Sequence, residues 1–275
     1  MLEDGAGAMD FARKVVLITG AAAGIGKAAA EAFARARAEA VVLVDRDEEH
    51  GEALARDLRD GGSKALFVPA DVASAEDMQR AVQLTIEQFG RIDCLFNNAG
   101  IEGTLAPSWS YDPVVFERVM AVNVTGVFMG MRMVLPHMRR QGAGAIVNSA
   151  SVGGLVAAPG MCAYVAAKHA VLGLTKCAAV EAGPDGVRVN AICPGTVETD
   201  MIRRIDAMRW PGGSEELQRF YGLMTPTRRA SSPEEVADLV LFLASSRSGN
   251  INGASIVADG GRHAGLSPWI EAGTV

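Results

Sequence analysis

Residues 14–26 read KVVLITGAAAGIG, and this stretch decides the fold. Its first six residues form an apolar run rich in β-branched side chains, which predicts a buried strand. The alanine-rich segment that follows, residues 25–37 (IGKAAAEAFARAR), predicts a helix. Three glycines, Gly20, Gly24 and Gly26, occupy the turn between the two elements. A buried strand that passes through a short turn into a helix is the repeating unit of a parallel sheet.

The alternation of strand and helix continues along the whole chain. Further strands are predicted at 40–45, 64–69, 92–97, 145–149, 187–193 and 254–258, and further helices at 47–60, 74–90, 113–141, 160–182 and from residue 232 onward. Strands that are apolar on both faces imply a parallel sheet with helices on both sides. Seven strands make one sheet, so we predict a single doubly wound α/β domain over residues 13–262.

The segments outside this pattern are predicted to be peripheral. Residues 1–12 are expected to form a flexible N-terminal extension, within which Met9 is an alternative start, and residues 263–275 a C-terminal tail. The stretch at about 195–231 has no clear element. A loop of that length in a compact domain is usually functional, so we predict a lid over the site.

The glycine turn has the spacing of a dinucleotide-binding site in a Rossmann-type fold. Gly20 permits the tight turn, Gly24 lets the backbone approach a pyrophosphate, and Gly26 allows close packing of helix on strand. Ala23 and Ile25 lie in the same turn, where the helix N-terminus supplies N–H groups and a partial positive charge.

The residue at the end of the second strand indicates which dinucleotide is bound. Asp45 follows Gly26 by 19 residues, where a carboxylate accepts hydrogen bonds from the adenosine ribose and repels a 2′-phosphate. Position 23 is alanine, so the turn offers no base to that phosphate, although Arg46 partly offsets the repulsion. The pattern favours NAD over NADP.

Composition excludes several other classes of protein. The chain has 275 residues, of which 49% are hydrophobic and 31 are glycine, and its formal net charge is −6. It therefore has material for a core and lacks the basic footprint of a nucleic-acid-binding protein. No cysteine or histidine pair has metal-ligand spacing, and the acidic start has no signal-peptide core. We expect a cytoplasmic protein with free thiols, no metal and no membrane span.

A series of short motifs, in order along residues 13–261, resembles those of the short-chain dehydrogenase/reductase family in its compact branch. They are TGxxxGxG at 19–26, Asp71-Val72, NNAG at 97–100, VNVTG at 122–126, NSAS at 148–151, YVAAK at 164–168, PGTVET at 194–199 and VADGG at 257–261. The resemblance implies a seven-stranded parallel sheet in the order 3-2-1-4-5-6-7. It also implies a homotetramer, with a dimer as the alternative.

Two residues of the YVAAK motif suit acid–base chemistry. Tyr164 and Lys168 are four apart and share a helix face, so the ammonium group is expected to lower the phenol's pKa toward neutrality. The resemblance makes Tyr164 the general acid/base, and Ser151, thirteen residues upstream, the substrate-binding serine in preference to Ser149. The resemblance also implies that Asn123 holds a water molecule, which links Lys168 to solvent as a proton relay.

The resemblance assigns further residues to the cofactor and the substrate. For the cofactor it adds Asp71, Val72, Asn98, Ala99, Gly100, Pro194, Gly195, Val197 and Thr199, together with Tyr164 and Lys168. For the substrate pocket it suggests Ile101, Glu102, Val152, Gly153, Met161 and Met201. Glu102 either reads a second substrate hydroxyl or faces solvent, and the second interpretation is favoured.

These expectations define an NAD-dependent oxidoreductase that interconverts a secondary alcohol and a ketone. An NADP-dependent carbonyl or 3-oxoacyl-thioester reductase is the main alternative. A nucleotide-binding module that senses NADH without turnover, and an oligomeric scaffold with a structural cofactor, are two further alternatives from other classes.

Overall fold

The computed structural model describes residues 9, 11–210 and 224–265. Its centre is a sheet of seven parallel strands in the order β3-β2-β1-β4-β5-β6-β7. The strands are β1 (Val15–Thr19), β2 (Ala40–Asp45), β3 (Ala65–Pro69), β4 (Cys94–Asn97), β5 (Gly144–Ser149), β6 (Val187–Pro194) and β7 (Ser255–Ala258). The predicted architecture and strand order are confirmed.

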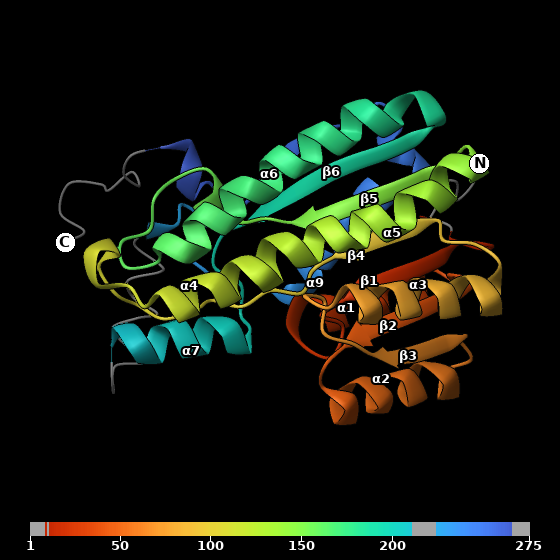
Figure 1. Ribbon diagram of the computed structural model, residues 1–275, viewed down its shortest axis with the longest axis horizontal. Helices are drawn as coiled ribbons and strands as arrows, with labels where there is room; N and C mark the ends of the chain where they lie inside the picture. Colours follow the sequence, from red (N-terminus) through yellow and green to blue (C-terminus); the bar gives the residue numbers. More distant parts are fainter. Residues whose placement is uncertain (1–8, 10, 211–223, 266–275) are drawn as a thin grey trace, which may run out of the picture.

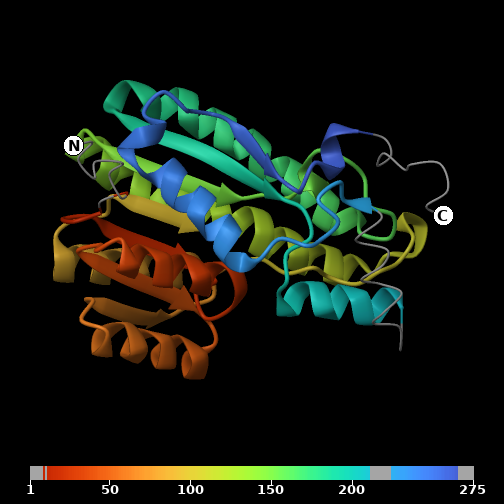
Figure 2. The ribbon, with the colours of Figure 1, turned by 180° about the vertical axis from the view of Figure 1, so that it is seen from behind.

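Helices cover both faces of the sheet, as the apolar strands require. One face carries α3 (Ala75–Phe89), α4 (Pro113–Met120), α5 (Gly126–Gln141) and α6 (Cys162–Ala182), which lie in front in Figure 1. The other face carries α1 (Gly24–Arg35), α2 (Glu48–Asp60) and α9 (Pro233–Ala244). This face is turned toward the reader in Figure 2. Each face has its own apolar core, and both cores include side chains of the interior strand β1.

Local sequence signals account for the ends of several helices. The Ser74 side chain accepts a hydrogen bond from the amide of Asp77 at the start of α3, and Gly90 ends that helix at φ +77°. Ser232 and Glu235 form a reciprocal capping box at the start of α9. These caps satisfy backbone groups that helix ends otherwise leave without partners.

The helical region Pro113–Gln141 consists of α4, a π-helical turn (Ala121–Thr125) and α5. By length and composition it is apolar enough to cross a membrane, which the sequence analysis had not expected. A buried core helix passes the same test, and 44% of its most apolar window is buried inside the protein. The π-helical turn is an interruption of the kind that often marks a functional site.

The predicted lid contains a helix where the sequence analysis expected only loop. Helix α7 (Asp200–Arg209) begins after Thr199, whose hydroxyl accepts a hydrogen bond from the amide of Ile202. The segment is tied at its base, because the amide of Ser231 donates to the carbonyl of Thr196 at 2.9 Å. The part of the predicted lid at 211–223 lies outside the described residues.

The ordered body extends beyond the predicted N-terminal boundary. Phe11, placed in the flexible extension by the sequence analysis, is buried and packs edge-on against Phe33 with ring centroids 4.9 Å apart. At the other end, a 3-10 turn (Arg262–Ala264) continues the body past β7. Residues 1–8, 10 and 266–275 lie outside the described residues.

Candidate active site

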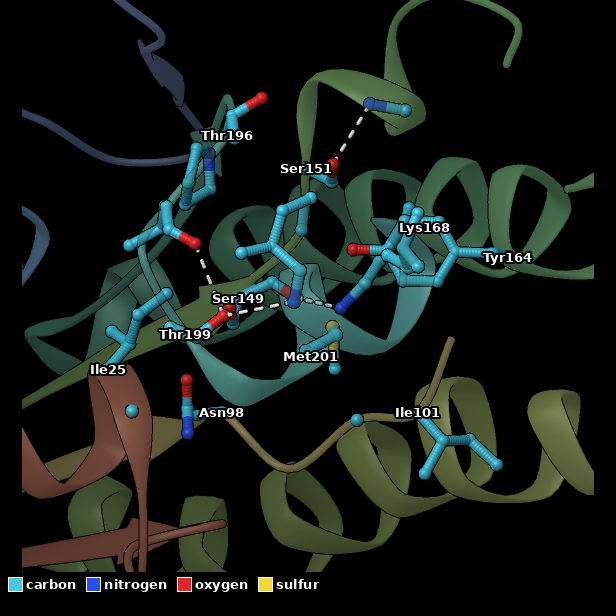
Figure 3. A pocket seen from close by; sticks show the side chains of 18 of the residues that line it. Ile25, Asn98, Ile101, Ser149, Ser151, Tyr164, Lys168, Thr196, Thr199 and Met201 are labelled. Carbon is cyan, nitrogen blue, oxygen red and sulfur yellow. Dashed lines mark hydrogen bonds between the residues drawn. The ribbon is translucent and has the colours of Figure 1, made fainter. Parts of the chain in front are cut away.

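A cavity of about 890 Å³ opens at the carboxyl ends of the strands. The chain reverses its direction of travel through the sheet between β1 and β4, and in folds of this kind ligands bind at that point. Figure 3 shows Ile25 and Asn98 on one side of the cavity, and Ser151, Tyr164 and Lys168 together on another. The glycine turn and the predicted catalytic residues therefore share one cavity.

The glycine turn has the geometry that a close approach of backbone to a ligand requires. Gly20 and Gly24 have φ values of +64° and +53°, which favour glycine. A Cβ on Gly26 would lie 2.0 Å from the carbonyl oxygen of Gly20, so helix α1 can pack this closely only without a side chain there. Ala23 caps α1 without a side-chain hydrogen bond, which leaves the first amides of the helix to a ligand.

Asp45 is held at the edge of this turn. Its Oδ2 accepts a hydrogen bond from the amide of Ala22 at 2.9 Å, and its Oδ1 accepts one from the amide of Asp47 at 3.1 Å. The carboxylate and the neighbouring Arg46 both line the cavity. A fixed carboxylate here is suited to the hydroxyls of a ribose.

The loop after β4 is joined to the glycine turn by hydrogen bonds. The hydroxyl of Thr19 accepts from the amides of Asn98 and Ala99 at 3.0 and 3.2 Å. The Asn98 side chain donates to the carbonyl of Gly20 at 2.9 Å. The NNAG motif therefore braces the turn, which explains why the two motifs are both present although 78 residues separate Asn98 from Gly20.

Ser151, Tyr164 and Lys168 meet at the opposite side of the cavity (Figure 3). The Lys168 ammonium is buried, donates to the carbonyl of Ser149 at 2.6 Å and lies 5.5 Å from the centroid of the Tyr164 ring. The hydroxyl of Ser151 accepts from the amide of Gly153 at 3.1 Å. Ser149 thus contributes its backbone to the site, and Ser151 is the serine whose side chain is close to the tyrosine.

Burial dominates the protonation of this group. It raises the pKa of Tyr164, which a hydrogen bond with Ser151 opposes and the negative charge of Glu102 reinforces. Burial likewise lowers the pKa of Lys168 to about 8. In the protein chain alone the pKa of Tyr164 is therefore raised by burial, and not lowered as expected from the neighbouring Lys168.

Asn123 lies behind the cavity wall. In the π-helical turn its side chain is fully buried, and its Nδ2 and Oδ1 hydrogen bond to the carbonyl and amide of Ile101 at 2.9 and 2.8 Å. A Cβ on Gly100 would lie 3.3 Å from Asn123 Oδ1 and 3.6 Å from Lys168 Nζ. Asn123 therefore positions the loop that separates it from the lysine.

Glu102 does not face solvent, contrary to the favoured expectation. Only 8% of its surface is exposed, and its Oε1 lies 2.5 Å from Nε of Arg204 on α7. A second hydrogen bond joins Arg204 Nη2 to Glu102 Oε2 at 3.3 Å. The ion pair ties the loop after β4 to the predicted lid.

Most predicted site residues line the cavity. Gly26, Glu102 and Asn123 are the exceptions. Several lining residues were not predicted from the sequence; they include Arg118, Thr196, Arg204, Arg209, Asp259 and residues 262–265. Thr199-Asp200, a helix cap followed by an acidic first turn, was the signal that could have revealed α7 and its arginines.

Comparisons with known proteins agree with this geometry. Residues 20–263 match a family model described as "Enoyl-(Acyl carrier protein) reductase". The chain is 43% identical over 249 residues to the A-factor type gamma-butyrolactone 1'-reductase (1S-forming) of Streptomyces virginiae, covering 90% of this chain and 95% of that one.

Two solved structures are similar as well. The crystal structure of levodione reductase matches with a TM-score of 0.89 and 37% identity, covering 93% of this chain and 100% of that one. NAD+-bound xylitol dehydrogenase matches with a TM-score of 0.84 and 35% identity, covering 90% and 98%.

The fold, the site and these relatives define a nicotinamide-dependent oxidoreductase that acts on CH–OH groups. The chain belongs to the short-chain dehydrogenase/reductase family.

Proposed function

We propose that the protein is an NAD-dependent dehydrogenase that interconverts a secondary alcohol and a ketone. The observation that carries the proposal is the placement of Ser151, Tyr164 and Lys168 in the same cavity as the glycine turn. A proton-transfer group and a dinucleotide cradle that face each other are what hydride transfer to or from an alcohol needs.

The residues on one side of the cavity fit a dinucleotide. The uncapped amides at the start of α1 would hold the pyrophosphate, and Asp45 the adenosine ribose. Lys168 would hold the nicotinamide ribose, and Val197 and Thr199, which also line the cavity, the carboxamide and phosphate regions. Bound there, the cofactor supplies the hydride acceptor or donor.

The chain's own residues manage the proton. Ser151 donates a hydrogen bond to the substrate oxygen, and Tyr164 takes the hydroxyl proton during oxidation or returns it during reduction. The ammonium of Lys168, 5.5 Å from the tyrosine ring, favours the phenolate that the first step requires. Asn123 supports a route from Lys168 to water by fixing the backbone of Ile101.

Asp45 favours NAD and the oxidising direction over an NADP-dependent carbonyl or 3-oxoacyl-thioester reductase. Its carboxylate stands where a 2′-phosphate would need a cation, and Ala23 supplies none. The similar xylitol dehydrogenase was solved with NAD+ bound, which supports the same choice.

Replacement of the general base tests the proposed chemistry. We expect Tyr164→Phe to lower kcat for any alcohol found in a screen with NAD by about 10²–10⁴-fold, since it removes the acid/base. Tyr111→Phe is the control, because that phenol accepts from the amide of Thr104 outside the cavity. A Tyr164→Phe enzyme that keeps most of its rate would contradict the assignment.

Replacement of Asp45 tests the cofactor choice. Asp45→Asn keeps an acceptor for the amide of Ala22 but removes the charge, so kcat/KM with NAD should fall by about 10-fold or more and that with NADP should rise. Asp47→Asn, which removes a charge from the same rim of the cavity, should change the ratio little. An unchanged NAD-to-NADP ratio in Asp45→Asn would contradict the proposal.

We propose further that the enzyme is a cytoplasmic homotetramer. The acidic net charge and the free cysteines are consistent with that compartment. Large apolar side chains lie exposed on the outer helices α4, α5 and α6, namely Val114, Phe116, Phe128 and Val180. Exposed apolar side chains of this kind suit contact with a second copy of the chain.

A further inference from the structure

The wall of the cavity formed by α7 and the turn after β7 carries positive charge. Arg204 and Arg209 come from α7, and Arg262 from the 3-10 turn (Arg262–Ala264). These segments are far apart in the sequence but line the same cavity. Arg204 is neutralised by Glu102, and this ion pair anchors α7 against the body. Two carboxylates line the same wall: Asp200 pairs with Arg203, and Asp259 accepts hydrogen bonds from backbone amides, so neither forms an ion pair with Arg209 or Arg262.

Arg209 is a half-buried guanidinium with a weak partner. Its Nη2 lies 3.3 Å from Sδ of Met161, and a thioether is a poor acceptor for a group that has five N–H donors. Over the described part of the chain, no carboxylate lies within 4 Å of it to form an ion pair. Its planar fork matches a carboxylate in bidentate geometry.

Arg262 adds a second guanidinium to the cavity, and the neighbouring Asp259 forms no ion pair with it. Asp259 is the acidic residue closest to it in sequence, but its two oxygens accept hydrogen bonds from the amides of Gly261 and His263 at 2.9 and 2.6 Å. Among the residues that the structure describes, Arg262 likewise has no carboxylate at ion-pair distance.

The contact with Met161 places the Arg209 guanidinium at the start of α6, the helix that carries Tyr164. Met161, which contacts the guanidinium, precedes Tyr164 by three residues at the start of α6. Met161 and Ile205 are both buried apolar residues of the cavity wall. A ligand with its carbinol at Tyr164 would therefore run along an apolar surface before it reaches the guanidinium.

We propose that Arg209, in a cavity that Arg262 also lines, binds a substrate carboxylate, so that the substrate is a hydroxy acid whose alcohol and acid groups are separated by a short apolar spacer. This inference rests on the proposed alcohol dehydrogenase activity and names its substrate class. Water-depleted surroundings strengthen such a charge-assisted contact, because Met161 and Ile205 exclude solvent from one side of it.

A comparison of acids with their esters tests the substrate class. The probes are 3-hydroxybutanoate, 4-hydroxypentanoate and 5-hydroxyhexanoate, each beside its methyl ester, with NAD as the cofactor. We expect at least one acid to exceed its ester in kcat/KM by about 10-fold or more. Arg209→Gln should lower this acid-to-ester ratio by about 10- to 100-fold, mainly through KM, and Arg209→Lys by less.

Arg203→Gln is the matched control. Arg203 lies on the same helix but pairs with Asp200 at the surface and does not line the cavity, so the ratio should stay as in the unaltered enzyme. Thermal unfolding of each variant identifies any that fails to fold. Equal use of acids and esters, or an acid-to-ester ratio that Arg209→Gln leaves unchanged, would overturn the proposal.

A binding measurement separates this inference from the proposed activity. Hexanoate has no hydroxyl to oxidise, so calorimetry with the NAD-saturated enzyme measures the carboxylate site alone. Hexanoate that binds the unaltered enzyme and loses about 10-fold or more affinity in Arg209→Gln supports the site, even if no alcohol is turned over and the dehydrogenase proposal fails. Turnover of neutral alcohols without any hexanoate binding supports the dehydrogenase and overturns the carboxylate site.

Discussion

At the scale of single residues, the site combines burial with charge. Tyr164 and Lys168 are both buried, and burial disfavours the charged form of each, so the pKa of the phenol rises and that of the amine falls to about 8. Ser151 and Glu102 then act on Tyr164 in opposite directions, since the first stabilises a phenolate and the second repels it.

This opposition predicts two shifts of the pH profile for alcohol oxidation. The reaction needs the phenolate, so kcat/KM rises with pH through the pKa of Tyr164. Ser151→Ala removes a hydrogen bond that lowers this pKa, so the rise should move to higher pH. Glu102→Gln removes a negative charge that raises the pKa, so the rise should move to lower pH.

The measurement is kcat/KM against pH for each variant with one alcohol. Glu117→Gln, a change to an exposed carboxylate on α4, is the control and should leave the profile in place. Shifts of the same sign in Ser151→Ala and Glu102→Gln would show that these residues do not act on Tyr164 as the structure indicates.

At the scale of elements, the glycine turn joins strand, helix and cofactor site. The three glycines were predictable because each answers a local steric demand within a single short turn. Helix α7 was not predicted, because the stretch at about 195–231 showed no clear element in the sequence; most residues of the helix face solvent or the cavity. Its cap at Thr199 was a local signal that the sequence analysis assigned to the cofactor alone.

The packing of the turn predicts a large difference between two glycine-to-alanine changes. A Cβ at Gly26 would lie 2.0 Å from a backbone oxygen, so Gly26→Ala should lower the free energy of unfolding by about 1–3 kcal/mol and weaken NAD binding. Gly173→Ala in α6 meets nothing within 4 Å and should stabilise the protein by about 0.5–1 kcal/mol. Thermal unfolding and NAD titration measure both effects. Equal stability of the two variants would refute the steric role of Gly26.

At the scale of the whole molecule, segments far apart in the described part of the chain line one cavity. The glycine turn after the first strand contributes to its wall, and so does Arg262 in the turn after the last strand. On the outside, α4, α5 and α6 cover one face of the sheet (Figure 1). These helices carry exposed apolar side chains. The cavity thus holds the proposed catalytic residues, and the outer face of α4, α5 and α6 is the surface that we assign to the proposed tetramer interface.

If this face forms the interface of the proposed tetramer, we expect a charged substitution on it to disrupt the oligomer. Phe128→Asp puts a charge on the exposed apolar face of α5, so light scattering should report a mass below that of the proposed tetramer. Leu84→Asp changes a side chain of similar exposure on α3 and is the control. A tetramer that survives Phe128→Asp, or a monomer in the unaltered protein, would remove α5 from the proposed interface.

The sequence by itself determined the order of strands and helices, the glycine turn and the spacing of Ser151, Tyr164 and Lys168. These features follow from hydrophobic periodicity and from steric demands between neighbours in the chain. Only the tertiary structure decided that Glu102 is buried against Arg204, 102 residues away, and that Arg209 contacts Met161. It also decided that burial raises the pKa of Tyr164. Such properties depend on which side chains exclude water from one another. The packing of segments that are distant in the sequence determines those neighbours.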